Sequence, residues 1–121
     1  MQKENKLLEE FNQIMAVAVK KGDTFAIYKY DIPITDEFTI SMPEEARILT
    51  VQTQRDSPYL WALVRPSAKK TTRTFRLIGT GVPISVQDAA KLLHIGTFQI
   101  KNGVLVFHLF EKIDDESAFT V

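Results

Sequence analysis

The sequence predicts an α+β, mainly β protein: a compact antiparallel β-sheet of about six short strands, preceded by one N-terminal amphipathic helix. Three observations support this fold class. Residues 3–20 carry apolar side chains at helical spacing, short runs of alternating apolar and polar residues follow from Thr24 onward, and Asn102-Gly103 separates two such runs. These patterns leave open whether the sheet forms a sandwich or a partly open barrel.

Length and composition set the class of protein. A chain of 121 residues suits a single domain, which we divide into a helix (1–22), a β-rich core (24–113) and an acidic tail (114–121). Fifteen basic and fifteen acidic side chains cancel, which argues against duplex nucleic acid or a membrane surface as partner. Without cysteine, disulfides and thiolate sites are excluded. No apolar run could span a bilayer, so we expect a soluble, cytoplasmic protein.

The N-terminal segment predicts a helix with one apolar stripe. Lys20 and Lys21 suit a helix C-terminus, and Gly22 suits its end. The helix either packs on the sheet or forms an oligomer contact, because an amphipathic helix needs a partner surface. The stripe consists of Leu7, Leu8, Phe11, Ile14, Met15 and Ala18.

Five segments between Thr24 and Gly79 predict strands, and one short segment after them predicts a helical turn. The run "YLWALVRP" is almost continuously apolar, which is typical of a strand covered on both faces. The helical turn is expected in "VQDAAKLL". The expected strands are residues 24–33, 38–43, 46–54, 59–66 and 73–79.

The clearest local signal is "TFQIKNGVLVFHLFEK". Asn102-Gly103 between alternating runs predicts a two-residue type I′ hairpin. The turn fixes a register in which Ile100 lies opposite Leu105 and Thr97 opposite His108. One hairpin face then collects only apolar side chains, as a core face requires. These are Phe98, Ile100, Leu105, Phe107 and Leu109.

Known catalytic motifs do not occur. The two histidines, His94 and His108, stand in "HIG" and "HLF", which match neither the two-histidine phosphodiesterase repeat nor a metal-hydrolase motif. A nucleophile elbow and a phosphate-binding loop are also missing. We therefore expect a protein that is not an enzyme and has neither a cofactor nor a metal site.

A basic segment suggests anion binding. No acidic residue occurs between Asp56 and Asp88, whereas five cations fall within twelve positions. Such a field favours phosphate, for which the arginine fork is well shaped. The alternative is a solvated loop paired with Glu44, Glu45 or the acidic tail. The five cations are Arg65, Lys69, Lys70, Arg73 and Arg76. On a strand, Arg73 and Arg76 face opposite sides, so at most one of them meets a ligand on the sheet face.

Further candidates are aromatic or lie beside glycine. Thr80 stands between two glycines, which suits either a phosphate contact or a plain turn. Trp61 is either a core residue or a stacking surface for a base, and Tyr30 is similarly ambiguous. His108 projects from the half-polar hairpin face next to Thr97, as a structural residue or a ligand contact.

Several motifs taken together resemble a family of small bacteriophage proteins, over residues 26–112. That family is similar to the phage anti-CBASS cyclic-nucleotide sponges. The amphipathic stretch 1–22 departs from the shorter members. The motifs are Tyr28-Lys29-Tyr30 with Pro33, Trp61-Ala62, Thr72-Arg73-Thr74-Phe75-Arg76, Gly79-Thr80-Gly81, Ile95-Gly96-Thr97, and Val106-Phe107-His108 with Glu111.

The resemblance implies a homo-oligomer in the host cytoplasm that sequesters a cyclic di- or trinucleotide without cleaving it. A protein-interaction module that inhibits or redirects a host protein is the alternative; a nucleotide-cleaving enzyme and a single-strand binder are weaker rivals. Among the motif positions, side-chain chemistry selects seven as ligand-binding. These are Tyr30, Trp61, Arg73, Arg76, Thr80, Thr97 and His108.

Overall fold

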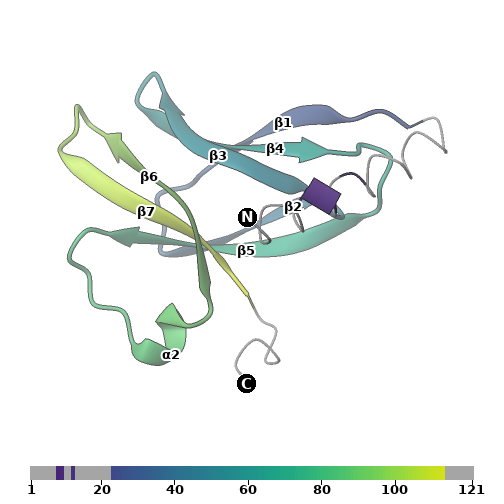
Figure 1. Cartoon of the computed structure of the whole chain (residues 1–121). Coiled ribbons are helices and arrows are strands. Elements are labelled where there is room, and N and C mark those ends of the chain that lie inside the picture. Colours follow the sequence, from purple (N-terminus) through teal and green to yellow (C-terminus); the bar gives the residue numbers. More distant parts are fainter. Residues whose placement is uncertain (1–7, 10–11, 13–22, 114–121) are drawn as a thin grey trace.

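The computed structural model of the protein describes residues 8–9, 12 and 23–113 (Figure 1). Within 23–113 it contains seven strands and one short helix. They are β1 (Ala26–Asp31), β2 (Glu37–Pro43), β3 (Arg47–Gln54), β4 (Ser57–Val64), β5 (Lys70–Gly79), α2 (Val86–Ala89), β6 (Leu92–Ile100) and β7 (Leu105–Lys112). The prediction of a mainly β protein is confirmed, as is the helical turn after β5.

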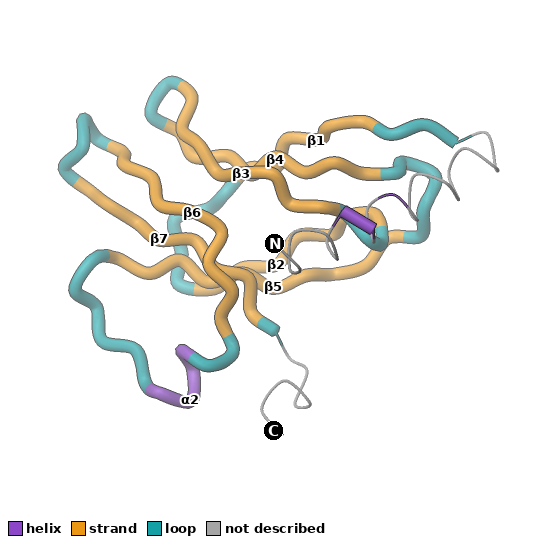
Figure 2. The backbone as a smooth tube through the Cα atoms, viewed as in Figure 1, coloured by secondary structure: helices purple, strands orange, loops and turns teal. Residues whose placement is uncertain are grey.

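The strands form two antiparallel sheets. The three-stranded sheet has the order β1-β4-β3, and the four-stranded sheet has the order β2-β5-β7-β6. Figure 1 shows the three-stranded sheet lying over β2 and β5, while the β6–β7 hairpin reaches to one side. Figure 2 shows that residues 80–91, which connect β5 to β6, are loop apart from α2. Both sheets are open at their edges, so the architecture has two layers and no closed barrel.

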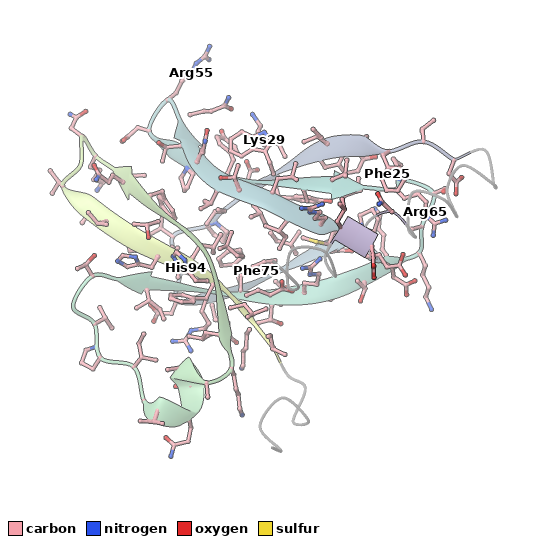
Figure 3. The ribbon with its side chains drawn as sticks, viewed as in Figure 1. Phe25, Lys29, Arg55, Arg65, Phe75 and His94 are labelled. Carbon is pink, nitrogen blue, oxygen red and sulfur yellow. The ribbon has the colours of Figure 1, made fainter. Side chains whose placement is uncertain are left out.

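The hydrophobic core lies between the two sheets. Its side chains alternate along each strand, because successive residues of a strand point to opposite faces. Phe75 is fully buried and stacks on Phe38 with 5.6 Å between the ring centroids; Figure 3 shows it between the layers. The strand residues of the core include Val51, Leu60, Ala62, Val64, Phe75, Leu77, Phe98, Ile100 and Leu109.

Strand β4 differs from the expectation. It was predicted to be covered on both faces, but its burial alternates: Leu60, Ala62 and Val64 are buried, whereas Tyr59 and Trp61 are only half-buried. Tyrosine and tryptophan count as apolar in a run, yet each carries a polar group that tolerates water. The continuous apolar run therefore concealed a strand with one inner and one outer face.

The predicted β6–β7 register is confirmed. Ile100 pairs with Leu105 and Thr97 with His108, and the turn occupies residues 101–104. Asn102 and Gly103 have φ angles of 55° and 83°, as a type I′ turn requires at both central positions, and Lys101 before them also has a positive φ, of 53°. The Asn-Gly pair thus determines which side chains of the hairpin enter the core.

The predicted N-terminal helix lies almost entirely outside the described residues. Leu8, Glu9 and Asn12 are helical, and beyond them the structure gives the prediction no support. Within the described part of the chain, no helix is long and apolar enough to cross a membrane.

The two sheets approach each other closely where β3 packs against β6. A Cβ atom added to Gly96 would lie 2.6 Å from Cγ1 of Val51, a buried and β-branched side chain with little freedom to move. Glycine is needed at this position because only a backbone without a side chain fits against Val51.

Replacing Gly96 by alanine is therefore expected to lower the free energy of unfolding by about 1–3 kcal/mol through overpacking. Urea denaturation measures this change. In the Val51→Ala background the same substitution should cost less, because the atom that it would strike has been removed. A Gly96→Ala protein as stable as the wild type would contradict the close approach.

Candidate functional site

The seven predicted ligand-binding side chains lie in three places. Trp61 is on the outer face of the three-stranded sheet, whereas Tyr30 and Arg73 point inward between the sheets. The other four share the outer face of the four-stranded sheet; they are Arg76, Thr80, Thr97 and His108. The seven therefore do not form one site, but three of them meet.

Thr80, Thr97 and His108 form a hydrogen-bonded cluster. His108 Nε2 lies 2.8 Å from Thr80 Oγ1, and His108 Nδ1 lies 2.8 Å from Thr97 Oγ1. A neutral imidazole has one donor and one acceptor nitrogen, and a hydroxyl group can complement either. The cluster is thus satisfied in both tautomers and holds the His108 ring in a fixed orientation. His94 Nε2 also approaches Thr97 Oγ1, at 3.4 Å.

Arg73 is occupied by protein groups. Its Nε and Nη2 donate to the two carboxylate oxygens of Glu111, each at 2.6 Å, and its Nη1 donates to the Ala46 carbonyl at 2.7 Å. Both side chains are mostly buried, with 23% and 18% of their surface exposed. This bidentate ion pair lies on the inner side of the fold and gives Arg73 a structural role.

One further cation of the basic segment pairs with a carboxylate. Arg65 Nη1 lies 3.1 Å from Asp23 Oδ2. Arg76, which faces away from Arg73 as predicted, donates from Nε to the Asp36 carbonyl at 3.2 Å. Carboxylates remote in sequence therefore compensate two of the five cations, Arg65 and Arg73, whereas Arg76 binds a neutral carbonyl group.

Tyr30 packs against the core from β1. Burial raises the pKa of its hydroxyl group above the ordinary value of 10.0, and the neighbouring Tyr28 adds a smaller increase. The two rings meet edge to face, with 6.3 Å between centroids. A neutral, half-buried phenol in this position fits a packing role.

The outer face of the three-stranded sheet carries an aromatic pair. Tyr59 and Trp61 are T-shaped, with 5.9 Å between ring centroids. Lys29 lies directly opposite Trp61 in the β1–β4 ladder, and Lys29 Nζ stands 4.3 Å from the centroid of the Tyr59 ring. Trp61 thus lies outside the core cluster, on a surface where aromatic rings and a cation occur together.

A pocket of about 730 Å³ opens beside this aromatic pair, and we call it the hairpin pocket. It is lined by Lys29, Gln54, Arg55, Ser57 and Tyr59. Lys29 Nζ donates to Gln54 Oε1 at 3.1 Å, and Figure 3 shows Lys29 and Arg55 on the same side of the sheet, with Arg55 at the hairpin tip. Among the described residues, two cations and no carboxylate line the pocket, although Asp31 lies opposite Tyr59 on the same face.

Sequence reasoning missed Lys29, Arg55 and Tyr59. Arg55 and Asp56 form the two-residue turn between β3 and β4, with φ angles of 50° and 65°. Arg-Asp is an uncommon pair for such a turn, so its signal in the sequence is weak. The alternation of β4 was the available signal, since it places Tyr59 on the same face as Trp61.

Two smaller pockets flank the contact between β3 and β6. One of about 530 Å³ lies between the tips of the β3–β4 and β6–β7 hairpins and is lined mainly by uncharged polar groups, among them Gln52, Thr97 and Gln99. The other, of about 220 Å³, includes Leu49, His94 and the Arg73–Glu111 pair. Neither combines cations with an aromatic surface as the hairpin pocket does.

Comparison with known proteins gives one result that bears on this arrangement. The model of a domain of unknown function, DUF7352, matches residues 24–120, which include all of the described strands. The searches of curated proteins and of solved structures found no match. The chain, with its two open sheets and its hairpin pocket, belongs to the DUF7352 family.

Proposed function

We propose that the protein binds and sequesters a cyclic di- or trinucleotide without cleaving it, as a homo-oligomer in the cytoplasm of a phage-infected host. The observation that carries the proposal is the hairpin pocket, where Lys29 and Arg55 accompany the ring of Tyr59. Cations favour phosphate, and an aromatic ring offers a stacking surface for a base.

The chemistry of the pocket suits each part of a nucleotide. Phosphate oxygens would accept from Lys29 and Arg55, and a base would stack on Tyr59 in the pocket or on Trp61 next to it. Gln54 and Ser57 offer polar groups for the sugar or the base edge. The volume lies within the roughly 300–1,000 Å³ that is usual for small-molecule sites.

The energies are of the required order. Stacking contributes about 1–3 kcal/mol per base, and a hydrogen bond to a charged group about 1.5–3 kcal/mol. Sub-micromolar affinity needs more than about 8 kcal/mol. Association itself costs about 4–15 kcal/mol in lost freedom of motion, so one pocket falls short of this value. Two pockets around one ligand are needed, which favours assembly of at least two copies.

The experiment is a titration of the pure protein with cyclic di- and trinucleotides, followed by melting temperature. Ligand binding to the native state raises the melting temperature by mass action. Chromatography of the ligand released by heat then separates two functions, since intact ligand indicates sequestration and altered ligand indicates an enzyme. If no nucleotide raises the melting temperature, the proposal is refuted.

Substitutions locate the site. Tyr59→Ala and Lys29→Ala are each expected to weaken binding by about 1–3 kcal/mol, which corresponds to a roughly 5- to 150-fold higher Kd in calorimetry. Lys70→Ala is the matched control, because Lys70 is an exposed cation of the basic segment that lies on the other sheet and does not line the pocket. Equal losses in Lys29→Ala and Lys70→Ala would show that net charge, and not the pocket, holds the ligand.

A protein-interaction module is the second candidate, and strand β1 favours it. This edge strand exposes Ile27 and Tyr28, with 61% and 40% of their surface accessible. An edge strand with accessible apolar side chains can accept a strand from a partner. This function would be supported instead by two results together. No nucleotide stabilises the wild-type protein, and an Ile27→Lys variant keeps its stability but loses a cellular partner.

A further inference from the structure

The outer face of the four-stranded sheet holds both histidines of the chain, and a β-bulge is responsible. In β6, Gly96, Phe98 and Ile100 face inward, so regular alternation would turn His94 inward as well. The register shifts between His94 and Gly96, and His94 pairs with Phe110 instead. Bulges re-aim side chains in this way and are frequent beside functional sites.

After this shift, two imidazole rings converge on one oxygen atom. His94 Nε2 lies 3.4 Å and His108 Nδ1 lies 2.8 Å from Thr97 Oγ1. The rings come from neighbouring strands, and His94 is exposed to solvent. Two imidazole nitrogens from different strands thus face the same oxygen atom.

We propose that His94 and His108 bind one divalent first-row transition-metal ion, with Thr97 Oγ1 and water as further ligands. Imidazole nitrogen is a preferred ligand of Ni²⁺, Cu²⁺ and Zn²⁺, at about 2.0–2.1 Å for zinc. Mg²⁺ and Ca²⁺ prefer oxygen ligands and are not expected to bind. This site lies on the four-stranded sheet and is independent of the hairpin pocket.

The surroundings already orient both rings. If His108 Nδ1 binds the ion, His108 Nε2 carries the proton and donates it to Thr80 Oγ1, 2.8 Å away. Metal-binding histidines commonly donate their second ring N–H to an oxygen acceptor, usually a carboxylate, a backbone carbonyl or water, and here the Thr80 hydroxyl group takes that place. The His94 ring meets Phe110 edge to face, with 5.3 Å between centroids.

The site is a two-imidazole site. No cluster of three or more His, Cys, Asp or Glu suited to a metal occurs among the described residues. The affinity should therefore be lower than that of structural zinc sites, which have four protein ligands. The sequence shows no metal-binding motif because the two ligands are not close in the chain. They meet only through hairpin pairing and the bulge.

The test is calorimetric titration of the tag-free full chain with NiCl2 and ZnCl2, together with electron paramagnetic resonance after addition of CuCl2. We expect one ion per chain and a copper spectrum with two equatorial nitrogens. His94→Gln and His108→Gln should each weaken binding at least tenfold. Thr80→Val should weaken it by about tenfold through loss of the oriented tautomer.

Controls separate the site from accidental binding. Thr39→Val, an exposed threonine on β2, should leave the affinity unchanged, and MgCl2 should give no saturable signal. Circular dichroism confirms that each variant is folded. Failure of all three transition-metal ions to bind at millimolar concentration overturns the proposal, as does binding that survives either histidine substitution unchanged.

Discussion

Phe75→Ala is expected to lower the free energy of unfolding by about 3–5 kcal/mol, the range found when a large buried aromatic is truncated. Phe75 is fully buried between the sheets and stacks on Phe38. Alanine would leave a cavity and remove the stacking partner at once. Urea denaturation at equilibrium measures the loss, with an unchanged slope showing that the same surface is exposed on unfolding.

Phe75→Leu is the matched comparison. Leucine keeps most of the buried volume but not the ring stacking, so it should lose less than half as much stability as alanine. If both variants lose the same amount, the stacking on Phe38 and not the cavity dominates. If Phe75→Ala lowers the free energy of unfolding by less than about 1 kcal/mol, as a surface substitution would, the burial of Phe75 is contradicted.

Arg73→Ala is expected to lower the free energy of unfolding by about 3 kcal/mol. Removal of one partner from a mostly buried pair leaves the other charge without compensation, and such losses are about 3–5 kcal/mol when burial is complete. Here Glu111 retains some contact with water, which places the effect at the lower end. The substitution also leaves the Ala46 carbonyl without its donor.

A double-mutant cycle tests this explanation. Arg73→Met combined with Glu111→Leu should be more stable than either single variant, because an apolar pair leaves no buried charge behind. Arg76→Ala makes the same change of charge on the outer face and should lose less than 1 kcal/mol, about the size of a surface effect. Additive losses in the cycle would contradict the coupling between Arg73 and Glu111.

Local features of the fold could be predicted from the sequence. Asn102-Gly103 sets the turn between β6 and β7 by its backbone preferences alone, and the register of the whole hairpin follows from it. Core residues such as Phe98 and Leu109 follow from the same register. The opposite orientation of Arg73 and Arg76 could also be predicted, because side chains alternate between the two faces of a strand with a period of two residues.

Long-range features could not be predicted in this way. Arg73 and Glu111 are 38 positions apart, and no local pattern indicates that they meet. The placement of His94 depends on one extra residue in β6, which moves a side chain from one face to the other. The outer position of Tyr59 and Trp61 was hidden because both count as apolar, although each tolerates a half-exposed surface.

Strand order has a consequence for synthesis on the ribosome. β7 is the last strand along the described chain, yet it lies between β5 and β6, and β6 pairs with no other strand. The four-stranded sheet can therefore be assembled only once residues 105–112 have left the exit tunnel. Until then the nascent polypeptide presents unpaired strand edges, the kind of surface that chaperones shield in incomplete β proteins.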